Sequence, residues 1–64
     1  MISDLDIYPA ANLVIKRHGA EAVIEAARMI DRMLELDDAE GRDLWRRIRR
    51  AIEMLQAPAH GVRH

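Results

Sequence analysis

The side chains with the clearest potential for chemistry are the five arginines of the stretch 38–56, which also holds the chain's only tryptophan. Arginine neutralises phosphate, so an arginine-rich helix could contact nucleic acid. At 100° per residue, however, the arginines wrap most of the outer face, and Asp43 and Glu53 lie among them at ion-pairing distance along the helix. This mixture is typical of a solvated or intersubunit face. The candidates for phosphate contacts are Arg42, Arg46, Arg49 and Arg50.

The other reactive side chains favour structural roles. Trp45 falls at the edge of an apolar helical arc, where we expect it half buried with its indole N–H toward a polar partner. His18 falls in the last turn of a predicted helix, where its ring can interact with the final carbonyls. The remaining histidines, His60 and His64, lack a paired ligand spacing, so we expect no metal site. No nucleophile–base pair or glycine-rich phosphate loop is present, so we expect neither enzymatic activity nor a cofactor.

Length and composition indicate one small domain that needs a partner. The chain has 64 residues, half of them hydrophobic, with no cysteine and only Tyr8 and Trp45 as aromatics. A domain of this size is marginal by itself, and small domains are stabilised by disulfides, metals or oligomerisation. Without cysteine, oligomerisation is the remaining route, and the core must be aliphatic. We expect a homo-oligomer, most simply a dimer.

The charge distribution is uneven along the chain. Residues 1–41 carry nine acidic and four basic side chains, whereas residues 42–64 carry six basic and two acidic ones. The overall net charge of −1 argues against a general affinity for nucleic acid. No apolar run reaches the roughly 20 residues of a membrane span, and the N-terminal residues do not resemble a leader peptide. We therefore expect a cytoplasmic protein that pairs its oppositely charged halves within or between chains.

Three helices are predicted, over about 7–18, 20–36 and 38–56. Ser3 and Asp6 are both possible N-caps of the first helix. Pro9 favours Asp6, because a helix capped there holds Pro9 in its first turn, where no backbone N–H is needed for a hydrogen bond within the helix. Gly19 is expected to end this helix in a left-handed conformation. Asp37, with Glu40 three residues later, resembles a capping box at the start of the last helix.

The predicted middle helix has an unusually wide apolar arc. Its apolar residues cover about half the circumference, compared with the roughly 100° stripe of an ordinary surface helix. This width predicts a central helix that touches both neighbours and a second chain. The last helix has a narrower arc, and Gly41 in its first turn suggests the close approach of another backbone. The arc of the middle helix contains Ala22, Val23, Ala26, Ala27, Met29, Ile30, Met33, Leu34 and Leu36.

Each predicted helix also carries one large apolar residue on its polar side. These are Leu13, Ile24 and Met54. One exposed apolar residue is ordinary, but one on each helix suggests a second apolar surface. We therefore expect an all-α fold, a small three-helix bundle of residues 1–56 completed by dimerisation, with a flexible tail at 57–64. The candidate interface residues are Leu13, Ile24, Met29, Met33, Trp45 and Met54.

Two runs of the chain resemble a family of very short alphaproteobacterial proteins known only as a domain of unknown function. The runs are IYPAANLVIKRHG at 7–19 and GRDLWRRI at 41–48, within a resemblance that spans about 5–56. Pro9 departs from the family pattern. The resemblance implies a bacterial, cytosolic origin but no activity or functional residue.

The sequence thus favours a helical module for self-association or protein–protein interaction. The alternative is a small nucleic-acid-associated regulator that uses the arginine-rich face of the last helix.

Overall fold

A computed structural model of the chain describes residues 4–57. The elements in this range are α1 (Asp4–His18), the 3-10 turn η1 (Gly19–Glu21), α2 (Ala22–Glu35) and α3 (Ala39–Gln56). The range contains no strand, so the all-α prediction is confirmed. None of its helices combines the length and the hydrophobicity that crossing a bilayer requires.

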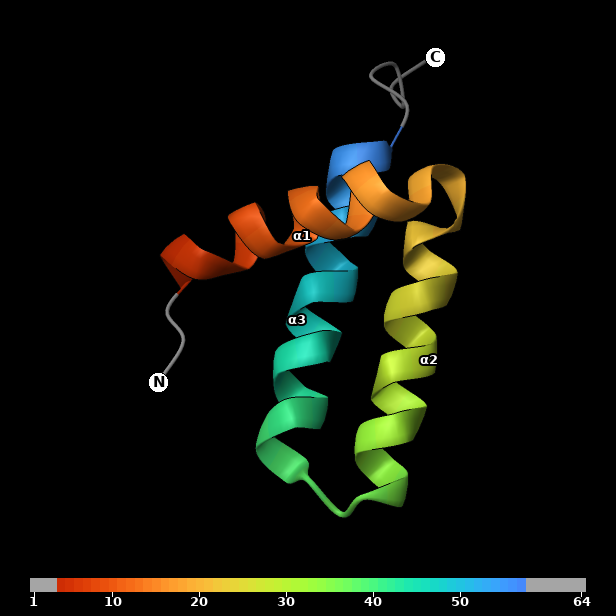
Figure 1. Cartoon of the computed structure of the whole chain (residues 1–64). Coiled ribbons are helices and arrows are strands. Elements are labelled where there is room, and N and C mark those ends of the chain that lie inside the picture. The colour runs from red at the N-terminus through yellow and green to blue at the C-terminus, as the bar shows by residue number, and fades with distance from the viewer. Residues whose placement is uncertain (1–3, 58–64) are drawn as a thin grey trace.

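The α2 and α3 helices run side by side in opposite directions, and α1 crosses one end of this hairpin (Figure 1). The crossing lies at the N-terminal end of α2 and the C-terminal end of α3. Because η1 separates α1 from α2 by only three residues, residues 4–35 form an almost unbroken helical run. The predicted three-helix bundle is therefore not confirmed, since only α2 and α3 align along their length.

The core lies where α1 meets the hairpin. Ala10, Val14, Ile15, Val23, Leu44 and Trp45 pack around its edge. Among the described residues no polar side chain is buried, so van der Waals packing and apolar burial hold the three helices together. Alanines predominate, which lets the helix backbones approach closely. The buried residues are Ile7, Ala11, Ala22, Ala26, Ile48, Ala51 and Ile52.

The first helix begins earlier than predicted. Because α1 starts at Asp4, Asp6 lies inside its first turn, and the prediction that Asp6 is the N-cap is wrong. Pro9 is the sixth residue of α1 and lies within the helix. Its ring nitrogen cannot donate to the carbonyl of Leu5, four residues back. The packing of Ile7 and Ala11 on the core holds this turn helical despite the missing hydrogen bond.

The turn from α2 to α3 is built by two aspartates with different roles. Asp37 adopts a left-handed conformation with φ of 57°, and its N–H donates to the carbonyl of Leu34 at 3.1 Å. The N–H of Asp38 donates to the carbonyl of Met33 at 2.8 Å. These two bonds form a Schellman motif that satisfies the last carbonyls of α2.

Asp38, rather than Asp37, caps α3. Its Oδ1 accepts a hydrogen bond of 2.9 Å from the N–H of Gly41, three residues later. The predicted capping box of Asp37 and Glu40 is therefore wrong by one position. Asp37 has a left-handed backbone and belongs to the motif that ends α2, so it lies outside the first turn of α3.

The sequence suggested that Gly41 allows the close approach of another backbone, but the atoms near it belong to side chains. A Cβ at this position would lie 2.6 Å from Asp38 Oδ2 and 2.7 Å from Met33 Sδ. Any larger residue would displace either the capping carboxylate or the methionine. The close approach also shows the register of the hairpin, in which Met33 of α2 lies opposite Gly41 of α3.

We expect substitutions at the two aspartates to change stability in opposite directions. Asp37→Gly should raise the free energy of unfolding by about 0.5–1 kcal/mol, because glycine adopts the left-handed conformation without steric cost. Asp38→Ala should lower it by about 1 kcal/mol through loss of the cap. Urea unfolding followed by circular dichroism, at one chain concentration, measures both. Equal effects of the same sign would contradict these assignments.

A hydrogen bond joins the last residue of α3 to the first residue of η1. The side-chain amide of Gln56 donates to the carbonyl of Gly19 at 2.9 Å. Gly19 has φ of 56°, which confirms the predicted left-handed end of the first helix. Ala57 is extended, as the residue before a proline prefers, and α3 ends before it. The rest of the predicted tail, 58–64, lies outside the described residues.

Candidate association surface

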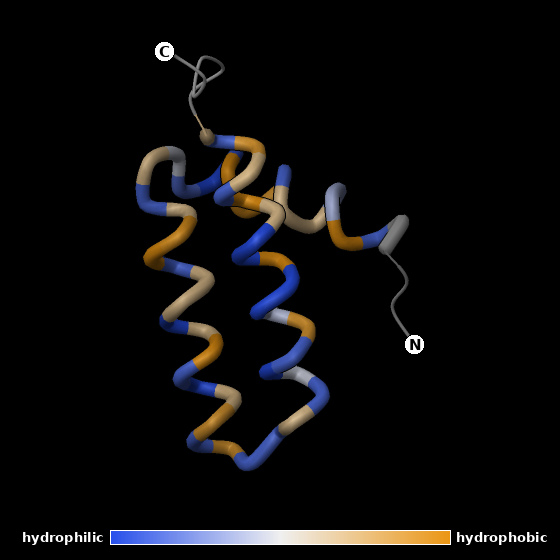
Figure 2. The backbone as a smooth tube through the Cα atoms, turned by 180° about the vertical axis from the view of Figure 1, so that it is seen from behind, coloured by the Kyte–Doolittle hydropathy of each residue, from blue (hydrophilic) through white to orange (hydrophobic). Residues whose placement is uncertain are grey.

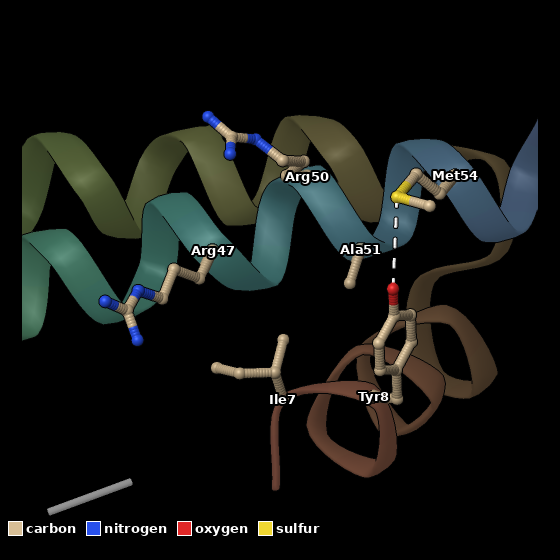
Figure 3. Close-up of a pocket in the computed structure, with 6 residues that line it drawn as sticks. All are labelled: Ile7, Tyr8, Arg47, Arg50, Ala51 and Met54. Carbon is tan, nitrogen blue, oxygen red and sulfur yellow. Dashed lines mark hydrogen bonds between the residues drawn. The ribbon is translucent and has the colours of Figure 1, made fainter. Parts of the chain in front are cut away.

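A groove of about 290 Å³ runs between α1 and α3 (Figure 3). Ile7 and Tyr8 form the α1 wall, and the Tyr8 hydroxyl donates a weak hydrogen bond of 3.9 Å to the sulfur of Met54. The α3 wall consists of Arg47, Arg50, Ala51 and Met54. The groove therefore shows on which side of α3 the first helix packs.

The groove offers little for catalysis. Its lining contains no carboxylate, thiol or imidazole, and Arg47 already lies 3.5 Å from Asp43 on its own helix. Figure 3 shows the Arg50 side chain directed away from Ile7 and Tyr8. Within residues 4–57, no group of three or more potential ligands lies close enough to hold a metal ion.

The interface candidates from the sequence occupy different parts of the molecule. Leu13, Ile24 and Met54 are each more than half exposed, but only Met54 lines the groove. Met29 and Met33 are partly buried on α2. The groove therefore does not bring Leu13, Ile24 and Met54 together.

Trp45 packs against the edge of the core and is partly buried. Within the described part of the chain its indole N–H has no hydrogen-bond partner. The expected polar partner is therefore not found there. His18 is exposed and makes no side-chain hydrogen bond at the start of η1, so it does not cap the preceding carbonyls.

The four arginines proposed for phosphate contacts also differ in surroundings. Arg49 lies 3.9 Å from Glu53, and Arg50 borders the groove beside α1. Arg42 and Arg46 form no ion pair with any residue in the described range. Of the pairings expected along α3, those of Arg47 with Asp43 and of Arg49 with Glu53 are present.

The angular position of each residue around its helix axis shows which residues lie on the side of the hairpin opposite α1. On α3, the groove residues Arg47 and Met54 lie about 100° and 120° to one side of Ile48, at 100° per residue. Trp45, Arg49 and Arg42 lie about 60°, 100° and 120° to the other side. They therefore belong to the side of the hairpin that α1 leaves uncovered. We call this side the far face.

On α2, four apolar residues turn toward the same far face. Relative to the buried Ala26, they lie between about 40° and 100° in the same rotational sense as Trp45. When two helices run in opposite directions, residues rotated in the same sense from the line of contact lie on the same side of the helix pair. Figure 2 shows hydrophobic segments recurring along α2, whereas α3 is interrupted by more hydrophilic ones. We call these residues the α2 stripe: Val23, Ala27, Ile30 and Leu34.

From the sequence, the α2 stripe was visible only as part of an unusually wide apolar arc on the middle helix. Ala22 and Ala26 alone are fully buried on α2, and the stripe is partly buried at three positions and 58% exposed at Leu34. Leu36 also belongs to the predicted arc of the middle helix, yet it is exposed. The groove residues Ile7 and Tyr8 were not recognised as a site, because only the crossing of α1 over α3 brings them to Met54.

Comparison of the chain with protein-family models, with curated proteins and with solved structures gives no match.

Proposed function

We propose that this protein is a small helical self-association module that forms a homodimer through the far face of its hairpin. The observation that carries the proposal is the α2 stripe. Leu34 is exposed at 58%, and Val23, Ala27 and Ile30 are only partly buried, while α1 covers the opposite side. Their spacings of four, three and four residues follow the repeat by which helices pack side by side.

The size of the far face suggests a modest affinity. A helix of 18 residues is about 27 Å long, and two adjacent helices are about 20 Å wide, so each copy can contribute about 500 Å². A dimer would bury about 1,000 Å² in total, near the lower limit for a specific interface. We therefore expect a dissociation constant in the micromolar range rather than an obligate dimer.

Sedimentation equilibrium tests the proposal directly. Between about 5 μM and 500 μM, the average mass should rise from the 7.3 kDa of one chain toward twice that value. Leu34→Glu should keep the chain monomeric over this range, because it places a charge in the apolar contact. Leu13→Glu is the matched control, since Leu13 is similarly exposed but lies on α1. A wild-type chain that stays monomeric at the highest concentration would overturn the proposal.

Nucleic-acid association is the competing function, and it would use Arg42, Arg46, Arg49 and Arg50. The four arginines span an arc of about 100° on the outer side of α3, but Glu53 lies within this arc, 3.9 Å from Arg49, which weakens a phosphate-binding strip. Binding to duplex DNA that weakens steeply with added salt would support this alternative. We propose an association role in a bacterial cytoplasm, without enzymatic activity.

A further inference from the structure

The far face has an acidic edge and a basic edge. On α2, Asp31 and Glu35 lie beyond the α2 stripe, about 140° and 180° from Ala26. On α3, Arg42 and Arg49 border the same face. Asp31 and Arg42 form no ion pair within residues 4–57, and Arg49 has only the 3.9 Å contact with Glu53. A second copy of the chain can therefore supply the partners that these edges lack.

Two symmetric ways of stacking far face on far face are possible. If the two-fold axis runs across the helices, α2 lies on the partner's α2 and α3 on the partner's α3. The two α3 edges then meet, and each carries more basic than acidic side chains, with Arg42 and Arg49 beside Glu53, so like charges predominate and repel. If the axis runs parallel to the helices, α2 lies on the partner's α3. The acidic edge then meets the basic edge twice, once on each side of the axis.

We infer that two copies of this chain associate about a two-fold axis parallel to α2 and α3, with Asp31 of each copy facing the partner's Arg42. The inference rests on the proposed self-association and specifies its geometry. A two-fold axis in this direction keeps each residue at its own height along the helices. Met33 of α2 lies opposite Gly41 of α3, and the two helices are antiparallel. The numbers of an α2 residue and an α3 residue at the same height therefore add to about 74.

This register brings complementary side chains to the same level. Asp31 falls within one residue of the height of Arg42, and Ile30 falls at the height of Leu44 and Trp45. The indole of the partner's Trp45 therefore packs beside Ile30 and Ala27. Trp45 thereby enters the interior between the two hairpins, which accounts for a large aromatic residue left partly exposed in one copy.

Charge reversal tests the pairing. Asp31→Arg and Arg42→Glu should each raise the dissociation constant at least about tenfold, because two attractive pairs become repulsive in each dimer. An equimolar mixture of the two variants should recover an affinity within about threefold of wild type, since its heterodimer has one reversed and one native pair. Arg50→Glu, on the groove side of α3, is the matched control and should leave the dissociation constant unchanged.

Cross-linking gives a second measurement that does not depend on reversed charges. The chain has no cysteine. A mixture of Asp31→Cys and Arg42→Cys chains, treated with a short bismaleimide, should yield the mixed cross-linked dimer as its main product. Each variant alone should yield little. This result remains obtainable if a charge reversal unfolds the chain, which circular dichroism would reveal.

The outcomes separate this geometry from self-association itself. A dimer whose dissociation constant is unaffected by Asp31→Arg and Arg42→Glu would overturn the geometry and leave the proposed function standing. Efficient cross-linking of Asp31→Cys to a second copy of itself would do the same, because it places α2 on the partner's α2. A wild-type chain that remains monomeric in sedimentation would overturn both.

Discussion

Ile52→Ala is expected to cost about 2–5 kcal/mol of folding free energy, the largest loss from any single truncation in this chain. Among the residues whose burial the structure describes, Ile52 is the one large side chain with no solvent exposure, and it belongs to the buried cluster that α1, α2 and α3 share. Four of the other six residues in the buried cluster are alanines, whose short side chains cannot move to fill a cavity. A domain of this size is stable by only about 3–10 kcal/mol, so the loss should remove much of its stability.

Thermal unfolding followed by circular dichroism measures this loss. At a fixed chain concentration, the midpoint should fall by about 10 °C or more. Leu55→Ala is the matched control on the same helix, because Leu55 is 45% exposed and its truncation should cost less than half as much. Equal losses at the two positions would show that the core is not centred on Ile52.

Pro9→Ala is expected to stabilise the chain by about 1–2 kcal/mol. A proline in a helix interior is about 3 kcal/mol less favourable than alanine. Proline also lowers the conformational entropy of the unfolded chain, which offsets part of this difference. Pro9 is exposed and is the sixth residue of α1, so alanine restores a donor to the Leu5 carbonyl without disturbing the core. The unfolding midpoint should rise by about 5–15 °C.

Asn12→Ala provides the comparison for Pro9→Ala. Asn12 is exposed on the same helix, and its replacement changes only helix propensity, which is worth about 0.7 kcal/mol or less. A Pro9→Ala chain no more stable than the Asn12→Ala chain would contradict the start of α1 at Asp4. It would favour a helix that begins after Asp6, in which Pro9 lies in the first turn.

The positions of most helix ends were predictable because they depend on local chemistry. Gly19 ends α1 in the predicted conformation, and α3 ends at Gln56, two residues before Pro58. The start of α1 was not predictable in this way, since the packing of Ile7 and Ala11 outweighs the local preference of Pro9. At the α2–α3 turn, Asp38 is the cap because Asp37 takes the left-handed position that follows the end of α2.

The candidate surface was predictable only in part. The periodicity of 22–36 showed that α2 has more apolar surface than one neighbour can cover, but it could not divide this surface between α3, α1 and solvent. Leu13, Ile24 and Met54 drew attention as apolar residues on polar sides. The structure places Met54 beside Tyr8 in the groove and leaves the other two apart from it.

The sequence by itself determined the all-helical class, the three helical segments to within a few residues, and the opposite charges of the two halves, because periodicity, caps and composition are local properties. The tertiary structure decided what depends on the position of α1. Because α1 crosses the hairpin on the side of Arg47 and Met54, it leaves Trp45 and the α2 stripe on the far face. This asymmetry, which no local pattern encodes, defines the surface through which we propose that two copies associate.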